Sequence, residues 1–337
     1  MLSVDAALRA GPAPLTLLSL GGSTLRGSIH EMSWRIDRQA PPIGSRLLEA
    51  RLSEALQKLS SRYGIEAKPK GRHQTALNVL KRWNESDELI DNENEDELRQ
   101  IAEAHRLAWE TFLITVAALE DRRNPLTFFT SEKINTFLGG DFISEGRVTE
   151  HRDTQFELTL AARLRLSGVS VTRGEPDMRI FYGAEEVGVA AKRICSSNID
   201  QVQKHARKAA KQIVEQGLCG WIALNLDSRF RKLRYPQHES DLLHEFSSTF
   251  NEVAPALERP ATKQHVLGFI MLGYVFGWEQ PATGGVPSLH WTTPLRWFRL
   301  ADNPEQRSLF EQFVNGVSTR WAARRRTLAS GDFIGLL

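Results

Sequence analysis

The feature that most constrains the fold is a change in hydrophobic periodicity after the Leu138-Gly139-Gly140 turn. From residue 154 onward, helical spacing of apolar residues gives way to short β-type runs, then returns, and is followed by one continuous apolar run. Helices repeat apolar residues every three or four positions, whereas strands alternate or, if buried on both faces, are apolar throughout. This order predicts an α/β layer arrangement. The expected elements are a helix at 154–167, strands at 169–173, 177–182 and 187–194, a helix at 199–216 and a strand at 220–226.

The first 130 residues are predicted to be mainly helical, with helices at 47–63 and 97–121. Gly64 stands where a glycine would cap the first of these helices. We therefore expect a helical region at 1–130 and an α/β domain at 131–337. In that second domain the later pattern predicts helices at 241–252 and 304–324. It also predicts strands around 266–278 and 289–300, the first of them a single buried strand.

Composition places the chain among ordinary globular proteins, with 41% apolar and 25% charged residues. A net charge of +2 predicts no overall attraction to nucleic acid, so any basic surface must be local. Cys195 and Cys219 suit a reducing compartment. The N-terminus lacks a signal-peptide pattern, and no apolar run is long enough to span a bilayer. We therefore expect a cytoplasmic protein with no membrane partner.

Glu157 is the first candidate site residue, because its helix face also carries Leu160, Ala161 and Leu164. A carboxylate aimed at an apolar layer is costly unless it is paired or binds a metal. An alternative is a capping box, in which Thr154 is the N-cap and Glu157 the third helical residue. Taken alone, the spacing favours the cap.

Two further candidates lie on the predicted hairpin. Pro176 cannot donate to a sheet ladder, so Asp177 should stand at the start of a strand, although a Pro-Asp pair alone is usually a turn. Lys192 interrupts an otherwise apolar strand and shares a face with Ala190 and Gly188. The alternative for Lys192 is an edge strand, where lysine discourages further pairing.

This ordered set of a helix acid, a strand-start Pro-Asp, a strand lysine, a helix and a buried strand resembles the PD-(D/E)xK nuclease superfamily. The resemblance covers a fifth to a quarter of the chain. It implies a restriction-endonuclease-like αβββαβ core in which acids hold Mg²⁺ or Mn²⁺ and the lysine assists the attacking water. Position by position, Asp177 matches the Asp, Lys192 the lysine and Glu157 the helix acid. The middle acid of the motif falls on Ala190, which cannot bind a metal.

The predicted helix at 199–216 adds a candidate and a surface. Gln212 borders its apolar stripe, and the resemblance implies that a glutamine from this helix lies near the site. The outer face is basic and is predicted either to contact phosphates or to be an ordinary solvated surface. Its basic residues are Lys204, Arg207, Lys208 and Lys211, with His205 nearby. A second basic cluster, Arg229, Arg231, Lys232 and Arg234, follows the strand at 220–226.

Ala190 has three explanations. The acid was removed on purpose to trap a nuclease, or it has moved elsewhere, or the chain is a degenerate nuclease that only binds. Glu186 lies about 13 Å away along the strand, and Glu175 precedes Pro176, so neither is a convincing substitute. We favour the first explanation, with the hypothesis that a parent sequence has an acid at position 190.

The expected function is therefore a metal-dependent nuclease that hydrolyses phosphodiester bonds, impaired in this chain by Ala190. DNA is the expected substrate, and phage defence or restriction the expected setting, with a homodimer or a partner protein in a defence complex. The residues leave open DNA or RNA, and endo- or exonuclease action. Two alternatives remain: a non-catalytic nucleic-acid-binding or scaffold protein, and a helical interaction protein with no nucleic-acid affinity.

Overall fold

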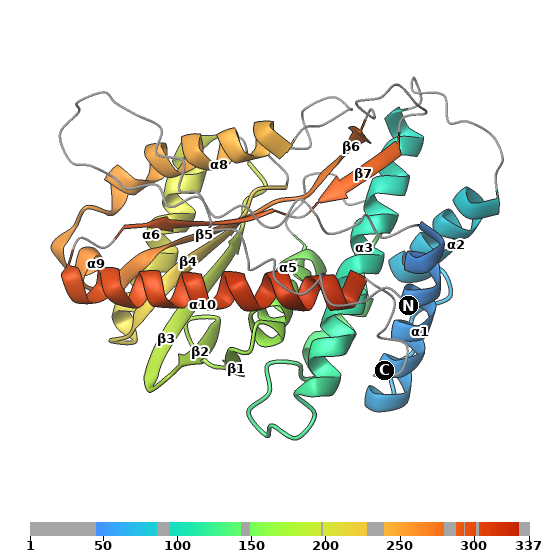
Figure 1. The fold of residues 1–337 in the computed structure, drawn as a ribbon, viewed down its shortest axis with the longest axis horizontal. Helices are drawn as coiled ribbons and strands as arrows, with labels where there is room; N and C mark the ends of the chain where they lie inside the picture. Colours follow the sequence, from blue (N-terminus) through green and yellow to red (C-terminus); the bar gives the residue numbers. More distant parts are fainter. Residues whose placement is uncertain are drawn as a thin grey trace, which may run out of the picture. The chain divides into compact units, whose positions relative to one another are not determined.

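The computed structural model describes residues 45–85, 95–142, 149–196, 198–227, 239–279, 288–292, 294–300 and 303–329. Contacts divide the chain into Met1–His30, which lies outside these residues, and Glu31–Leu337, which contains all of them. The described part is a mixed α/β structure with a six-stranded sheet and a mostly helical N-terminal region (Figure 1). The basic cluster at 229–234 lies outside the described residues.

The N-terminal region contains two predicted helices and two that the sequence pattern missed. The helices are α1 (Ser45–Tyr63), α2 (Arg72–Glu85), α3 (Glu95–Glu120) and α4 (Ser131–Leu138). The predictions of α1 and α3 are confirmed, and Gly64 ends α1 with a positive φ of 65°. The α2 helix escaped prediction because two of its five buried residues, Arg72 and His73, are polar. The α4 helix is only eight residues long, and the Thr130 side chain caps it.

The central elements occur in the predicted order. They are α5 (Glu150–Leu166), β1 (Ser170–Arg173), β2 (Met178–Tyr182), β3 (Glu185–Arg193), α6 (Ile199–Glu215) and β4 (Cys219–Asn225). The first three strands pair antiparallel, and β3 then pairs parallel to β4. Because β3 lies between β2 and β4, the alternative interpretation of Lys192 as an edge-strand residue is wrong.

The C-terminal elements extend the sheet but correct two predicted strands. They are α8 (Glu239–Val253), η1 (Ala254–Leu257), α9 (Pro260–His265), β5 (Val266–Leu272), β6 (Val275–Glu279), β7 (Ser288–Thr292), β8 (Leu295–Arg299) and α10 (Pro304–Ala329). The runs at 266–278 and 289–300 each form two strands, not one. The chain leaves the main sheet at Gly273, where a Cβ atom would come within 2.7 Å of the Leu242 side chain. The strands β6 and β7 then pair as a separate ribbon, while β5 and β8 complete the sheet.

Helices cover both faces of the sheet (Figure 1). On β4, Trp221 and Ala223 pack into the apolar cluster that includes α3, α5 and α10. The alternate residues Ile222 and Leu224 pack into a second cluster with α6 and α8. A parallel strand buried on both faces explains the continuous apolar run that marked this segment in the sequence. The first cluster runs without a break from α1–α3 into the sheet, across residue 130. Among the described helices, none combines the length and apolar character needed to cross a membrane.

Candidate functional site

Asp177 lies immediately before β2, where the pairing between β2 and β3 ends. The last paired residues are Met178 and Val189, so Asp177 faces Ala190 in the continued register. Its Oδ2 atom accepts hydrogen bonds from the Ala191 backbone N–H at 2.7 Å and from the Lys192 ammonium at 2.8 Å. The Asp177 carboxylate therefore binds a β3 backbone N–H just beyond the last residue pair of β2 and β3, and it holds the Lys192 side chain in place.

Lys192 lies near the C-terminal end of β3, on the side of the sheet that α6 covers. Its side chain is 17% exposed and that of Asp177 is 18% exposed, so the ion pair is partly shielded from water. The positive charge of Lys192 acts on the His205 side chain of α6. It lowers the pKa of His205, and only the effect of burial is larger. The strand parity expected from the sequence places Lys192 and Ala190 on this same face.

Glu157 reaches the same neighbourhood from α5. The helix begins at Glu150 after Thr149, and Thr154 is buried within it, so the capping-box interpretation is wrong. Glu157 accepts a 2.5 Å hydrogen bond from the Lys133 ammonium on α4. Burial raises the pKa of Glu157, Lys133 opposes this rise, and the nearby charge of Asp177 adds to it. Lys192 also contributes, so these three predicted residues act on one another electrostatically.

Ala190 is fully buried and belongs to the apolar layer between the sheet and α6. Its neighbours in that cluster include Val202, Ala206 and Ala209 on the helix and Ile222 on β4. Small alanines on both elements allow the helix to approach the strand closely. A larger acidic side chain at position 190 would have to displace this packing or turn toward Asp177.

Gln212 lies in the last turn of α6. One helical turn later, Gln216 accepts a 3.4 Å hydrogen bond from Arg179 of β2. The Gln212 Oε1 atom is buried, and no hydrogen-bond partner for it occurs among the described residues. A buried acceptor without a donor is costly, so we expect a bound water or ligand to donate to this atom.

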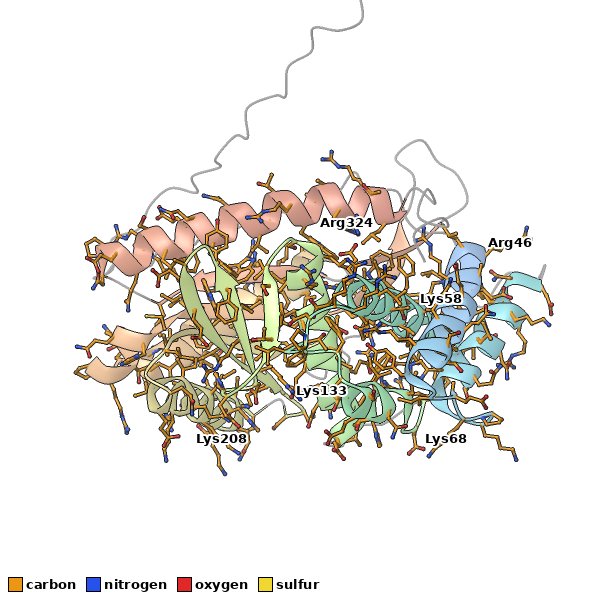
Figure 2. All side chains as sticks on the ribbon, turned by 90° about the horizontal axis from the view of Figure 1, so that it is seen from below. Arg46, Lys58, Lys68, Lys133, Lys208 and Arg324 are labelled. Atoms are coloured by element: carbon orange, nitrogen blue, oxygen red, sulfur yellow. The ribbon has the colours of Figure 1, made fainter. Side chains whose placement is uncertain are left out.

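The basic face of α6 is solvent-exposed at Lys204, Arg207, Lys208 and Lys211. Figure 2 shows Lys208 projecting away from its helix. The face adjoins the site through His205, whose pKa is lowered by burial and by Lys192, Lys208 and Lys204. Two of the cations have local partners, Lys211 with Glu215 and Arg207 with Gln203.

Two of the three expected metal ligands are present at the site. The carboxylates of Glu157 and Asp177 are suitable oxygen donors, and magnesium often takes only one or two protein carboxylates together with substrate phosphate. Position 190 supplies no third donor. Within the described ranges, no group of three or more His, Cys, Asp or Glu residues is placed to hold a metal ion. Glu157 and Asp177 are therefore the two carboxylates at this site that could bind Mg²⁺, and each is paired with a lysine, Lys133 and Lys192 respectively.

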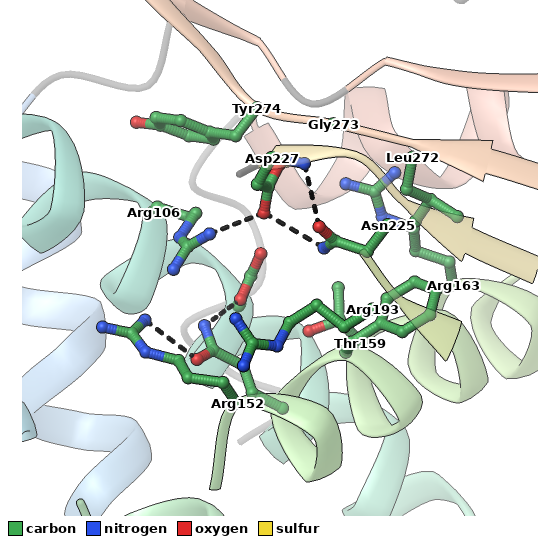
Figure 3. A pocket seen from close by; sticks show the side chains of 13 residues that line it. Arg106, Arg152, Thr159, Arg163, Arg193, Asn225, Asp227, Leu272, Gly273 and Tyr274 are labelled. Atoms are coloured by element: carbon green, nitrogen blue, oxygen red, sulfur yellow. Dashed lines mark hydrogen bonds and ion pairs between the residues drawn. The ribbon is translucent and has the colours of Figure 1, made fainter. Parts of the chain in front are cut away.

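A second cluster of polar residues was not singled out from the sequence. Arg106, Glu110, Arg152, Gln155 and Asp227 surround a cavity between α3, α5 and the ends of the parallel strands. Figure 3 shows side chains from these elements converging on one space. Four of the lining residues form a polar stripe on α5, which is otherwise buried in the core: Arg152, Gln155, Thr159 and Arg163. This stripe of buried polar residues is the sequence feature that could have indicated the cavity.

The chain matches no family model, no curated protein and no solved structure.

Proposed function

We propose that the chain has a PD-(D/E)xK nuclease fold and the site of a metal-dependent phosphodiesterase that lacks one metal ligand at Ala190. The observation that carries this proposal is that Asp177 pairs with Lys192 and that both charges act on the carboxylate of Glu157, which comes from α5. The succession α5-β1-β2-β3-α6-β4, with β3 parallel to β4, supports the restriction-endonuclease-like core.

Each residue has a distinct role in this proposal. Asp177 and Glu157 would hold Mg²⁺ or Mn²⁺, which supplies an activated water and neutralises phosphate charge when it is bound. Lys192, fixed by Asp177, places a positive charge beside the reacting phosphate and orients the attacking water. Nucleic acid, with DNA preferred, is the substrate class, and phage defence or restriction is the proposed setting.

Restoring an acid at position 190 should restore cleavage. Ala190→Glu is expected to cleave about 10- to 100-fold faster than this chain with Mg²⁺ or Mn²⁺, because it adds the missing ligand. Adding Lys192→Ala to that variant should abolish the gain. The measurement is a nuclease assay on plasmid, linear duplex, single-stranded DNA and RNA.

Ala190→Gln is the matched control, because it fills the same buried space without a carboxylate and should stay inactive. Circular dichroism must show that each variant is folded, since position 190 lies in an apolar layer. If folded Ala190→Glu protein cleaves none of the four substrates with either metal, the catalytic proposal fails.

A second function, nucleic-acid binding without cleavage, is favoured by the complete burial of Ala190 in its apolar cluster. The exposed cations of α6 would then contact phosphates, and a homodimer or a partner protein in a defence complex would act on the bound strand.

Removing three of these cations should weaken binding and its dependence on salt. Lys204→Ala, Arg207→Ala and Lys208→Ala together are expected to reduce the slope of log K against log salt by about 2 to 3, given about 0.7 to 0.9 per phosphate contact. Fluorescence anisotropy with labelled DNA at several salt concentrations measures this slope. A control with the same charge change replaces the exposed Lys68, Lys70 and Lys81. Equal slopes in both triple variants would exclude α6 as the binding face.

A further inference from the structure

The cavity between α3, α5 and the parallel strands lies at the carboxyl ends of β3, β4 and β5. Arg193, Asn225 and Leu272 end these strands in register and line it. Ligands of open α/β sheets bind at this edge, where strand ends leave a crevice. The cavity has a volume of about 30 Å³. This space has room for a small polyatomic ion.

Positive charge exceeds negative charge around this cavity. The buried network is joined by hydrogen bonds and ion pairs from Arg106 to Asp227 and Glu103, and from Gln155 to Glu110. Burial raises the pKa of Glu110, which disfavours its negatively charged form. Burial also lowers the pKa of Arg163 to about 10, and the neighbouring charge of Arg325 contributes to the drop. Four arginines line the cavity and only two acids do. The arginines are Arg106, Arg152, Arg163 and Arg193, and the acids are Glu110 and Asp227.

Two buried donors at the cavity have no acceptor in the described part of the chain. They are the Arg106 Nε–H and the Thr159 hydroxyl, on residues that are 4% and 3% exposed. Leaving such groups unpaired is costly, so a ligand or water should occupy their acceptor position. The Asp227 Oδ1 atom also lacks a partner there and can accept from a protonated ligand oxygen.

We propose that this cavity binds a phosphate group, with the rest of any larger ligand outside its mouth. Arg106 offers its Nε–H, because its two terminal nitrogens already donate to Asp227 and Glu103, and the Thr159 hydroxyl is a second donor among the side chains that converge on this space (Figure 3). The charge of Arg193, which also lines the cavity, favours an anion. The cavity lies on the α5 side of the sheet, whereas Ala190 faces α6. The residues that would bind phosphate do not include Asp177, Lys192 or Glu157, so this site does not rest on the proposed nuclease activity.

Isothermal titration calorimetry of the whole chain with inorganic phosphate tests the site, against sodium chloride at equal ionic strength. Phosphate is expected to give saturable binding that chloride does not give. Thr159→Val, which keeps the shape and removes the hydroxyl, should weaken phosphate binding about tenfold, since a hydrogen bond to a charged ligand is lost. Arg106→Lys keeps the charge, removes the Nε–H and should weaken binding as well.

Thr115→Val is the matched control, because Thr115 is also a buried helical threonine but its hydroxyl donates to Thr111 within α3. It should bind phosphate as the unchanged chain does. Adenosine monophosphate and oligonucleotides with and without a terminal phosphate distinguish a free phosphate from a nucleotide or a strand end. Absence of saturable binding by any phosphate compound, or equal affinity in Thr159→Val, would show instead that the network only supports the fold.

Discussion

Arg106→Met is expected to destabilise the protein by about 3 to 5 kcal/mol, because it leaves buried carboxylates without their counter-charge. Arg106 donates to Asp227 at 2.6 Å and to Glu103 at 2.9 Å, and both ion pairs have side chains less than one-tenth exposed. Burial lowers the pKa of Arg106, but the charges of Glu103 and Asp227 outweigh this and raise it overall. The arginine therefore stays charged and joins α3 to the end of β4.

Urea unfolding of both proteins measures the loss, provided that the slope of the free energy against urea is unchanged. Arg99→Met, on the same helix, is the control, because its 3.7 Å pair with Asp96 is exposed and contributes less than about 1 kcal/mol. Combining Arg106→Met with Asp227→Asn should recover part of the stability, since one uncompensated charge is removed. A cost below about 1 kcal/mol for Arg106→Met would show that water reaches the network and replaces the arginine.

Acidification from pH 6.5 to pH 4 should cost the protein about 3 kcal/mol through His105 alone, at 1.36 kcal/mol for each unit of pKa difference. Burial lowers the pKa of His105 to about 4, although its bond to the Ile101 carbonyl opposes the shift. The unfolded chain has an ordinary histidine and binds a proton near pH 6.5, whereas the folded chain does so only near pH 4. The stabilisation is therefore complete above pH 6.5 and is lost as the pH falls toward 4.

His105→Gln keeps a donor for the Ile101 carbonyl and removes the titrating ring. Unfolding free energies of both proteins at half-unit pH steps give a difference curve, in which carboxylate titrations common to both cancel. That curve should fall by about 3 kcal/mol over this range. His73, whose pKa is also lowered by burial, titrates in both proteins. A flat difference curve would contradict the buried, neutral state of His105.

Much of the candidate site could be predicted from sequence because its signals are local. Pro176 cannot donate to a sheet ladder, which placed Asp177 at the start of the strand, and β2 begins at the next residue, Met178. Lys192 within an apolar run could be assigned to a strand face by parity alone. Glu157 was different, since one spacing fitted both a cap and an inward carboxylate. The start of α5 at Glu150 decided between them.

Hydrophobic periodicity was sufficient to predict the order of elements from α5 to β4 and the face on which each residue of β3 lies, because periodicity is a property of neighbours along the chain. The central position of β3 and the division of the run at 266–278 at Gly273 became apparent only from the pairing of the strands. Folding also brings arginines from α3, α5 and β3 into one cavity with Asp227. These outcomes depend on pairing and packing between residues far apart in sequence, such as Arg106 and Asp227, and no local pattern records such contacts.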